Sequence, residues 1–536
     1  LRTLGVGAVK IPVWSGLAGV PDLTESAESD DALLYELLKS RIAVTGVFAG
    51  PPSQLVRTAG AYPRHLLALL SDDPDAWVNY LERVVAPYSS IFRSWQIGAD
   101  GDPFVPADPR LPTVIQTVRT EMRRLTTAPH LTVPGSLDRA PGDEPLTADD
   151  ICLTVDDAIL PRYIASHLKE YTSRGLPVSS VYVEPAPFDG TDAESRLRDW
   201  CKRLLHVRLA GVETVMVPQP WHTSSGSGRT VTEPTAEFVV LHTLDVISDS
   251  VPGQPMNVAP GVTALPFNKG EHTVLALWDD YAGPEGRVHT LQLGAADRQV
   301  DMLGRVTMLT RTDDGRQNIH LTREPTFVIG ADRWLVQFRT LMSLTPKQVE
   351  FRIDAHRHEF KLVNSLNVPL GGSIRIVPHE GWDVSPSFFK FAASAGGTFT
   401  KALTLKFGRG EMAGAKTFEF HVDLDSDGQY KLVVPLTLEL GIEELEAWGY
   451  AIVDNNRLIV RHGVTNRSND VLSFRGAAIA PGRLLQRRPL SDLQPGQTVT
   501  LEYRFRDPDE LRGRTIRLLL RELDGPRMHN IEVLVP

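Results

Sequence analysis

The stretch Ser94-Trp95-Gln96-Ile97-Gly98-Ala99-Asp100-Gly101-Asp102 joins a short apolar segment to two carboxylates that flank a glycine. The apolar residues predict a β-strand, and the glycines predict that it ends at Gly98 and opens into an acidic loop. A second stretch, Val181-Tyr182-Val183-Glu184-Pro185, is also a short strand pattern that ends on an acid. We interpret these two strand ends as the acidic walls of one pocket.

The first part of the chain, residues 1–248, alternates short apolar runs with longer helical patterns. This alternation indicates β/α units and a parallel sheet. Strands are expected at 4–14, 42–49, 94–98, 130–133, 151–155, 178–183 and 212–217, and helices at 31–39, 62–70, 75–85, 111–125, 161–173 and 193–209. Seven strands are one short of a (β/α)8 TIM-type barrel. Because the sequence opens at Leu1 without a start methionine, we expect an N-terminally truncated barrel whose missing strand precedes this residue.

After Ser248 the long helical patterns give way to glycine, proline and short alternating strands. This texture is typical of all-β sandwiches. We expect an accessory β-sandwich at 249–350 and two immunoglobulin-like β-sandwiches at 351–440 and 441–536. The expected fold class is therefore multidomain, with a barrel followed by three sandwiches.

The composition excludes several classes of protein. Of the 536 residues, 42% are hydrophobic and 23% charged, as in ordinary globular proteins, and the formal net charge of -10 argues against a nucleic-acid partner. The two cysteines, Cys152 and Cys201, allow at most one disulfide, and we expect two buried free thiols. No apolar run reaches the roughly 18 residues that a membrane-spanning helix needs.

The strand ends resemble a known group of enzymes. Trp95-Gln96-Ile97-Gly98-Ala99-Asp100 is similar to the barrel strand Trp-x-Ile-Gly-Asn-Glu of clan A glycoside hydrolases, in particular family 39 and its relatives. A later strand that ends in Glu184, a last strand that ends near Trp221 and an appended β-sandwich complete the resemblance, which covers about residues 1–345. It departs at Ala99, where the family has asparagine, and at Asp100, where it has glutamate.

The resemblance implies a role for each acid. Glu184 stands at the position of the nucleophile and Asp100 at that of the acid/base. A retaining glycosidase holds these two carboxyl groups about 5 to 5.5 Å apart, whereas a wider gap suits inversion through a water. Asp102, on the same loop as Asp100, is an alternative acid and a candidate contact to the substrate. Both main candidates also have a simpler interpretation, as solvated loop carboxylates or helix caps.

Aromatic residues near the strand ends are candidates for stacking on sugar rings. Trp221, Trp14 and Tyr182 are proposed as such surfaces, with His222 as a hydrogen-bond donor, whereas Trp95 is expected to fill the core. His356 and His358 alternate on a strand, but without a third ligand they do not predict a metal site. We expect no cofactor.

Two functions are compatible with these patterns. The first is a glycoside hydrolase that acts on a polysaccharide or glycan, of the secreted, periplasmic or cell-surface kind that bacteria export. The second is a catalytically inactive barrel that binds carbohydrate or acts as a scaffold, which the departures at Ala99 and Asp100 favour. Both have carbohydrate as their partner, and the sequence names neither the sugar nor the oligomeric state.

Overall fold

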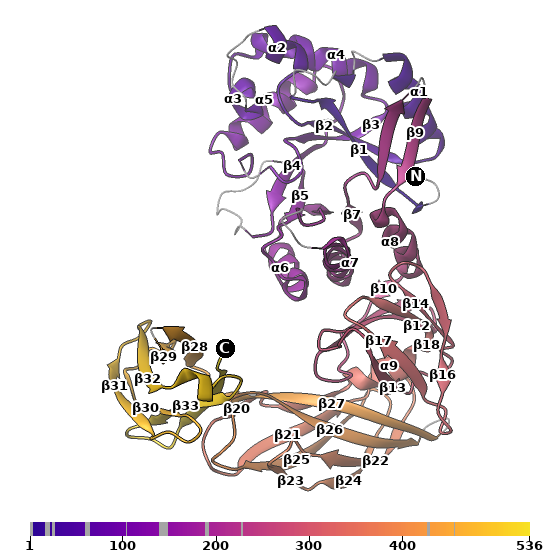
Figure 1. Cartoon of the computed structure of the whole chain (residues 1–536). Helices are drawn as coiled ribbons and strands as arrows, with labels where there is room; N and C mark the ends of the chain where they lie inside the picture. Colours follow the sequence, from indigo (N-terminus) through magenta and orange to yellow (C-terminus); the bar gives the residue numbers. More distant parts are fainter. Residues whose placement is uncertain are drawn as a thin grey trace.

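The computed structural model describes residues 4–16, 22–23, 27–58, 65–102, 104–138, 148–187, 192–226, 229–425, 429–454 and 456–536. The chain forms a mixed α/β part at its N-terminal end, followed by a succession of β-sheets (Figure 1). In this part of the chain no helix is long and apolar enough to cross a membrane. Cys152 and Cys201 are both buried and free, which confirms the prediction made for the two cysteines.

Seven parallel strands form the N-terminal sheet, and their order in the sheet is their order in the sequence. They are β1 (Ala8–Trp14), β2 (Ala43–Phe48), β3 (Phe92–Ile97), β4 (Leu131–Ser136), β5 (Asp150–Val155), β6 (Val178–Val183) and β7 (Thr214–Met216). All seven predicted strands are confirmed. The curled sheet resembles a (β/α)8 barrel, although among the described residues no strand joins β7 to β1. We call it the barrel-like sheet.

Helices alternate with these strands, as the sequence predicts. They are α1 (Ala27–Lys39), α2 (Ser53–Thr58), α3 (Leu66–Leu70), α4 (Val78–Tyr88), α5 (Leu111–Met122), α6 (Pro161–Ser173), α7 (Ala193–Leu209) and α8 (Ala236–Leu244). Helix α5 shows why they form. Its apolar residues recur every three or four positions, and Leu111, Val114, Ile115, Val118 and Met122 are all buried. The helix predicted at 62–70 begins only at Leu66 in the described residues, and 62–64 lie outside them.

The first sheets after the barrel-like sheet lie between residues 251 and 332. One sheet has the order β10-β11-β12-β18-β14-β15 and the other β13-β17-β16. The strands are β10 (Val251–Pro252), β11 (Val262–Lys269), β12 (His272–Asp279), β13 (Arg287–Leu291), β14 (Arg298–Asp301), β15 (Val306–Met308), β16 (Thr310–Arg311), β17 (Gln317–Leu321) and β18 (Thr326–Asp332), and α9 (Arg333–Thr340) follows.

Two further pairs of sheets complete the chain. The first pair has the orders β19-β21-β25-β23 and β20-β27-β26-β22-β24, and the second β28-β29-β32 and β31-β30-β33-β34. The strands of the first pair are β19 (Met342–Thr345), β20 (Gln348–Glu350), β21 (His356–Val363), β22 (Leu370–Val377), β23 (Trp382–Ser385), β24 (Phe388–Ala393), β25 (Thr398–Phe407), β26 (Gly414–Asp425) and β27 (Gln429–Gly441). Those of the second are β28 (Leu445–Asp454), β29 (Arg457–Asn466), β30 (Leu472–Ile479), β31 (Gln486–Leu493), β32 (Thr498–Arg506), β33 (Thr515–Glu522) and β34 (Met528–Leu534).

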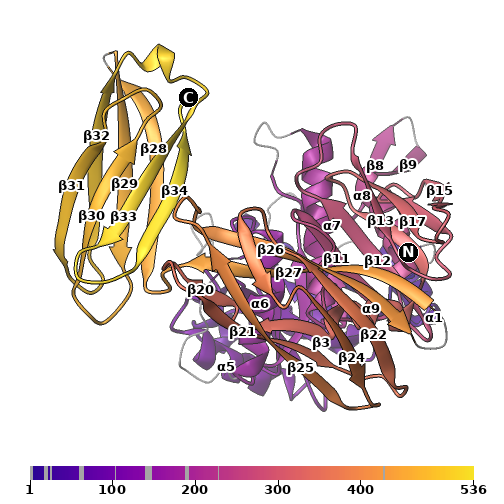
Figure 2. The same ribbon diagram turned by 90° about the horizontal axis from the view of Figure 1, so that it is seen from below.

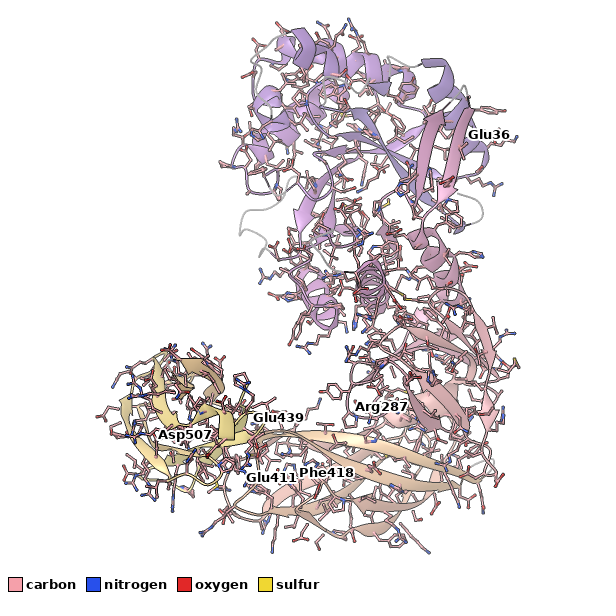
Figure 3. All side chains as sticks on the ribbon, viewed as in Figure 1. Glu36, Arg287, Glu411, Phe418, Glu439 and Asp507 are labelled. Atoms are coloured by element: carbon pink, nitrogen blue, oxygen red, sulfur yellow. The ribbon has the colours of Figure 1, made fainter. Side chains whose placement is uncertain are left out.

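Alternating burial shows that the sheets of each pair enclose an apolar layer. Every second residue of β21 is buried, and Phe418 on β26, labelled in Figure 3, is 1% exposed. The last pair, β28 to β34, stands apart from the other sheets in Figure 2. The predicted domain boundaries and the immunoglobulin-like character of the last two sandwiches stay predictions.

One core connects the barrel-like sheet to the sheet that follows it. The hydrophobic cluster that contains β1 to β6 also includes Phe267 of β11 and Trp278 of β12. The ring of Trp278 lies 5.9 Å from that of His206 on α7, and Lys202 of the same helix pairs with Asp280 at 2.7 Å. Helix α7 therefore packs between the two sheets.

Candidate active site

A lysine inside the barrel-like sheet holds the carboxylate that follows β3. Lys10 Nζ on β1 lies 2.6 Å from Asp100 Oδ1, and Gln96 on β3 donates to the same oxygen at 3.0 Å. Lys10 also donates to Cys152 Sγ on β5 at 3.0 Å. Lys10, Gln96 and Cys152 come from β1, β3 and β5. The side chains that form one layer of a barrel interior also come from alternate strands. Asp100 is therefore held by groups from separate strands.

The loop after β3 turns Asp100 back toward these strands. Gly98 and Gly101 have φ angles of 103° and 75°, which a residue with a side chain rarely adopts. The amide of Gly101 donates to Thr154 Oγ1 on β5 at 3.0 Å, and the Gln96 amide nitrogen donates to the carbonyl of Gly98 at 3.0 Å. The two glycines allow the turn, and the two hydrogen bonds fix it.

The charges of both candidate carboxylates act on the hydroxyl of Tyr182, on β6. The pKa of its hydroxyl is raised, first by burial and then by the negative charges of Glu184 and Asp100. Cys152 acts on the same hydroxyl. The phenol of Tyr182 therefore remains protonated. The glutamate side chain itself is exposed at the end of β6.

The thiol of Cys152, next to Lys10, is fully buried. Burial raises the pKa of Cys152, and the charge of Asp100 adds to the effect. Lys10 and a hydrogen bond with Ser180 oppose it, but burial outweighs them. Cys152 therefore stays a neutral thiol that accepts a hydrogen bond from Lys10. The negative charge that balances Lys10 comes from Asp100.

Two of the predicted sugar contacts have other roles. Trp14 is 1% exposed and packs edge-on against Phe48 at 4.7 Å, so it fills the core and offers no face to a sugar. Its prediction as a sugar platform is wrong, because β1 directs it inward. Asp102 accepts from the amides of Phe104 at 2.8 Å and Val105 at 3.4 Å, so it closes its own turn. Trp95 lies in the core as expected, at 2% exposure.

Trp221 and His222 lie on a hairpin that the sequence did not predict. Strand β7 ends at Met216, and Trp221 begins β8 (Trp221–Gly226), which pairs with β9 (Arg229–Pro234). Trp221 is half-buried and His222 is exposed. The last strand of the sheet was predicted at 212–217 and ends at Met216, and four residues separate Met216 from Trp221. The role of Trp221 and His222 as sugar contacts stays a prediction.

No group of three or more metal-ligating side chains occurs in the described part of the chain. His356 Nε2 contacts the carbonyl of Arg352, and His358 Nδ1 that of Pro346, each at 2.9 Å. Burial lowers the pKa of His358. Each imidazole thus has one ring nitrogen bound to the backbone.

Sequence reasoning missed Lys10, Gln96 and Cys152 as parts of the site. A signal for Lys10 was present, because it stands inside the apolar strand Ala8-Val9-Lys10-Ile11-Pro12-Val13-Trp14. A charged residue in such a strand needs a partner of opposite charge. The sequence does not identify Asp100 as that partner, since the pairing depends on how β1 and β3 lie in the sheet.

The comparisons with known proteins place glycoside hydrolases among the structural neighbours. One is a family 39 glycoside hydrolase from the gut symbiont Bacteroides cellulosilyticus WH2, at 13% identity over 61% of this chain and 76% of that one, with a TM-score of 0.43. Others are a GH30 endoxylanase from Clostridium papyrosolvens C71 (12%, 61% and 90%, TM-score 0.40) and an α-amylase from Anoxybacillus (11%, 62% and 88%, TM-score 0.35). No protein-family model and no curated protein matches the chain. Similarity at this level does not assign an activity.

Proposed function

We propose that the chain is a glycoside hydrolase that acts on a polysaccharide or glycan at the carboxyl ends of β3 and β6. The observation that supports this most is the position of the two acids after strands of one parallel sheet, Asp100 after β3 and Glu184 after β6. The charges of both acids also act on the hydroxyl of Tyr182. Two carboxyl groups on either side of a glycosidic bond are what its hydrolysis requires. In a parallel sheet of this kind, catalytic groups gather at the carboxyl ends of the strands.

Each residue then has a distinct task. Glu184, exposed at the end of β6, attacks the anomeric carbon and forms a glycosyl ester. Asp100 gives a proton to the leaving oxygen and afterwards takes one from the water that cleaves the ester, so the sugar keeps its anomeric configuration. Tyr182, whose pKa is raised, donates its phenolic proton in a hydrogen bond to a sugar oxygen or to Glu184.

A second function is favoured by the ion pair of Asp100. A general acid must carry a proton before the reaction, yet protonation of Asp100 would give up its contact with Lys10. Ala99, moreover, has no side-chain amide to bind a sugar hydroxyl. A barrel that binds glycan without cleaving it is consistent with both features. In either case we propose an exported location, which cell fractionation would test.

The experiment is hydrolysis of a panel of aryl glycosides by the wild type, Glu184→Gln and Asp100→Asn. Asp157→Asn is the matched control, because Asp157 is an exposed acid shortly after β5. We expect turnover by the wild type and the control, and a loss of about 10²-fold or more in each of the other variants. Turnover that persists in Glu184→Gln would refute the assignment. A wild type that retains glycans in affinity gels but cleaves none would establish the second function.

A further inference from the structure

Two aromatic rings lie exposed on the last pair of sheets, far along the chain from the barrel-like sheet. Trp448 and Tyr450 occupy alternate positions of β28, and each is 39% exposed. Their ring planes are within 9° of parallel, with centroids 5.7 Å apart. The residues between and beside them, Ala447, Gly449 and Ala451, are less exposed and belong to the other face of the strand. The two rings therefore form one aromatic surface on the outer face of the sheet β28-β29-β32.

The neighbouring strand fits this surface. Trp448 pairs across the sheet with Gly463 on β29, where an added Cβ would lie 2.1 Å from ring carbons of Trp448. Only glycine allows the indole to lie this low over the backbone. Covering a strand glycine with an aromatic ring is itself stabilising, and this explains one face of Trp448. It explains neither the exposed remainder of the indole nor Tyr450, which pairs with Arg461.

A rim of charged groups holds the second ring. Arg461 donates to the Tyr450 hydroxyl at 2.8 Å and lies 5.9 Å from its ring centroid. On the next strand Glu502 lies 3.6 Å from Arg461 and accepts from Arg504 at 2.7 Å. These groups fix the orientation of the tyrosine and leave donors and acceptors beside both rings.

We propose that this aromatic surface, formed by Trp448, Tyr450 and the rim of Arg461 and Glu502, binds a glycan chain. A pyranose ring has an apolar C–H face and a rim of hydroxyls, and the surface offers rings for the first and charged groups for the second. The two ring centroids lie 5.7 Å apart on one strand, which suits consecutive units of a chain better than one small ligand. A stable protein partner would bury roughly 800 Å² of surface on this chain, far more than two rings bordered by charged residues supply. The site is separate from Glu184 and Asp100 and does not depend on their activity.

Affinity electrophoresis of the full chain tests the proposal, in native gels that contain cellulose derivatives, xylan, mannan, chitosan or starch. All proteins carry Glu184→Gln, so that hydrolysis does not remove the ligand. We expect retardation by at least one polysaccharide, weakened about tenfold in Trp448→Ala and in Tyr450→Ala. Phe388→Ala is the control, since this ring is 53% exposed on β24 of another sheet pair. It should leave retardation unchanged.

A loss of folding is distinguished from a loss of binding. Trp448→Ala uncovers Gly463 and can lower the stability of the sheet. Trp448→Phe and Tyr450→Ala keep that glycine covered, and we require their melting temperatures to equal that of the parent to within a few degrees. Equal retardation of the parent and the ring variants would overturn the proposal, and so would the absence of retardation in every gel. The proposal would also be overturned by a protein that forms a concentration-dependent dimer, if Tyr450→Ala abolished the dimer and left the retention by glycan unchanged. The aromatic surface would then contact a second copy of the chain through the edge strand β28.

Discussion

Lys10 and Asp100 form an ion pair of 2.6 Å between β1 and the loop after β3. Their side chains are only 13% and 16% exposed, so the pair lies largely inside the barrel-like sheet. At such a site each charge depends on the other, because neither is well solvated. The same contact joins the stability of the sheet to the chemistry proposed at its edge.

Removing the lysine should destabilise the protein. We expect Lys10→Met to lower the free energy of unfolding by about 2 kcal/mol, because it leaves Asp100 without its partner. The double variant Lys10→Met/Asp100→Asn should recover part of this loss, which urea denaturation would measure. Lys39→Met is the control, since Lys39 and Glu36 of α1 (Figure 3) form an exposed pair at 3.6 Å. Equal effects of Lys10→Met and Lys39→Met would contradict the interpretation.

Asp22 connects the segments that follow β1 and β2, two neighbouring strands of the sheet. Its Oδ1 accepts from the amide of Ser15 after β1 at 2.9 Å, and its Oδ2 from that of Ser53 at the start of α2 at 2.7 Å. The residue is 5% exposed. Replacing it by alanine removes an acceptor from two amides, and we expect a loss of about 2 to 3 kcal/mol in the free energy of unfolding.

The control for Asp22→Ala is an aspartate with a similar bond at the surface. Asp192 caps α7 by accepting from the amide of Ser195 at 2.7 Å and is exposed. Asp192→Ala should lower the free energy of unfolding by about 1 kcal/mol. If Asp22→Ala were no more harmful than Asp192→Ala, burial would not be what makes the Asp22 contacts important.

Tyr182→Phe separates the phenolic hydroxyl from the ring. Because burial and the charges of Glu184 and Asp100 raise the pKa of Tyr182, its hydroxyl stays a donor throughout the neutral range. We expect the variant to fold normally and to lose about tenfold in kcat/KM, or in glycan affinity if the barrel only binds. The ratio of wild type to variant should not change between about pH 5 and pH 9. A ratio that falls toward the alkaline end would mean that the hydroxyl titrates there.

Local periodicity explains why most of the N-terminal fold could be predicted. Helices α6 and α7 were predicted with the bounds that they have in the structure, because an apolar stripe on a long segment and clear termini leave little freedom. Strand β7, predicted at 212–217, is shorter in the structure, with three residues from Thr214 to Met216, because the ends of a strand are weakly marked in the sequence.

The site was harder to predict because its contacts are not local. The sequence marks Asp100 and Glu184 as acids at strand ends, but it does not contain the contact of Asp100 with Lys10, which depends on the order β1-β2-β3. Trp14 shows the opposite limit. An aromatic residue at a strand end suits a sugar platform and a core equally well, and only the direction of its side chain decides.

Glu324 and Glu194 provide a pH-dependent contact between the barrel-like part and the sheets that follow. Glu324 precedes β18 and Glu194 lies in the first turn of α7. Burial, and then the hydrogen bond and the charge of Glu194, raise the pKa of Glu324 from 4.5 to about 7. Between these values the folded chain binds a proton that the unfolded chain releases. The stabilisation is therefore complete below pH 4.5 and is lost as the pH rises through about 7.

We expect the free energy of unfolding of the wild type to fall over this range. Glu324→Gln, which keeps a neutral hydrogen-bonding group, should lack this pH dependence and be the more stable protein at pH 8. Glu439→Gln, an exposed change on β27, is the control and should follow the wild type. Parallel curves for the wild type and Glu324→Gln would show that the two carboxyl groups do not share a proton.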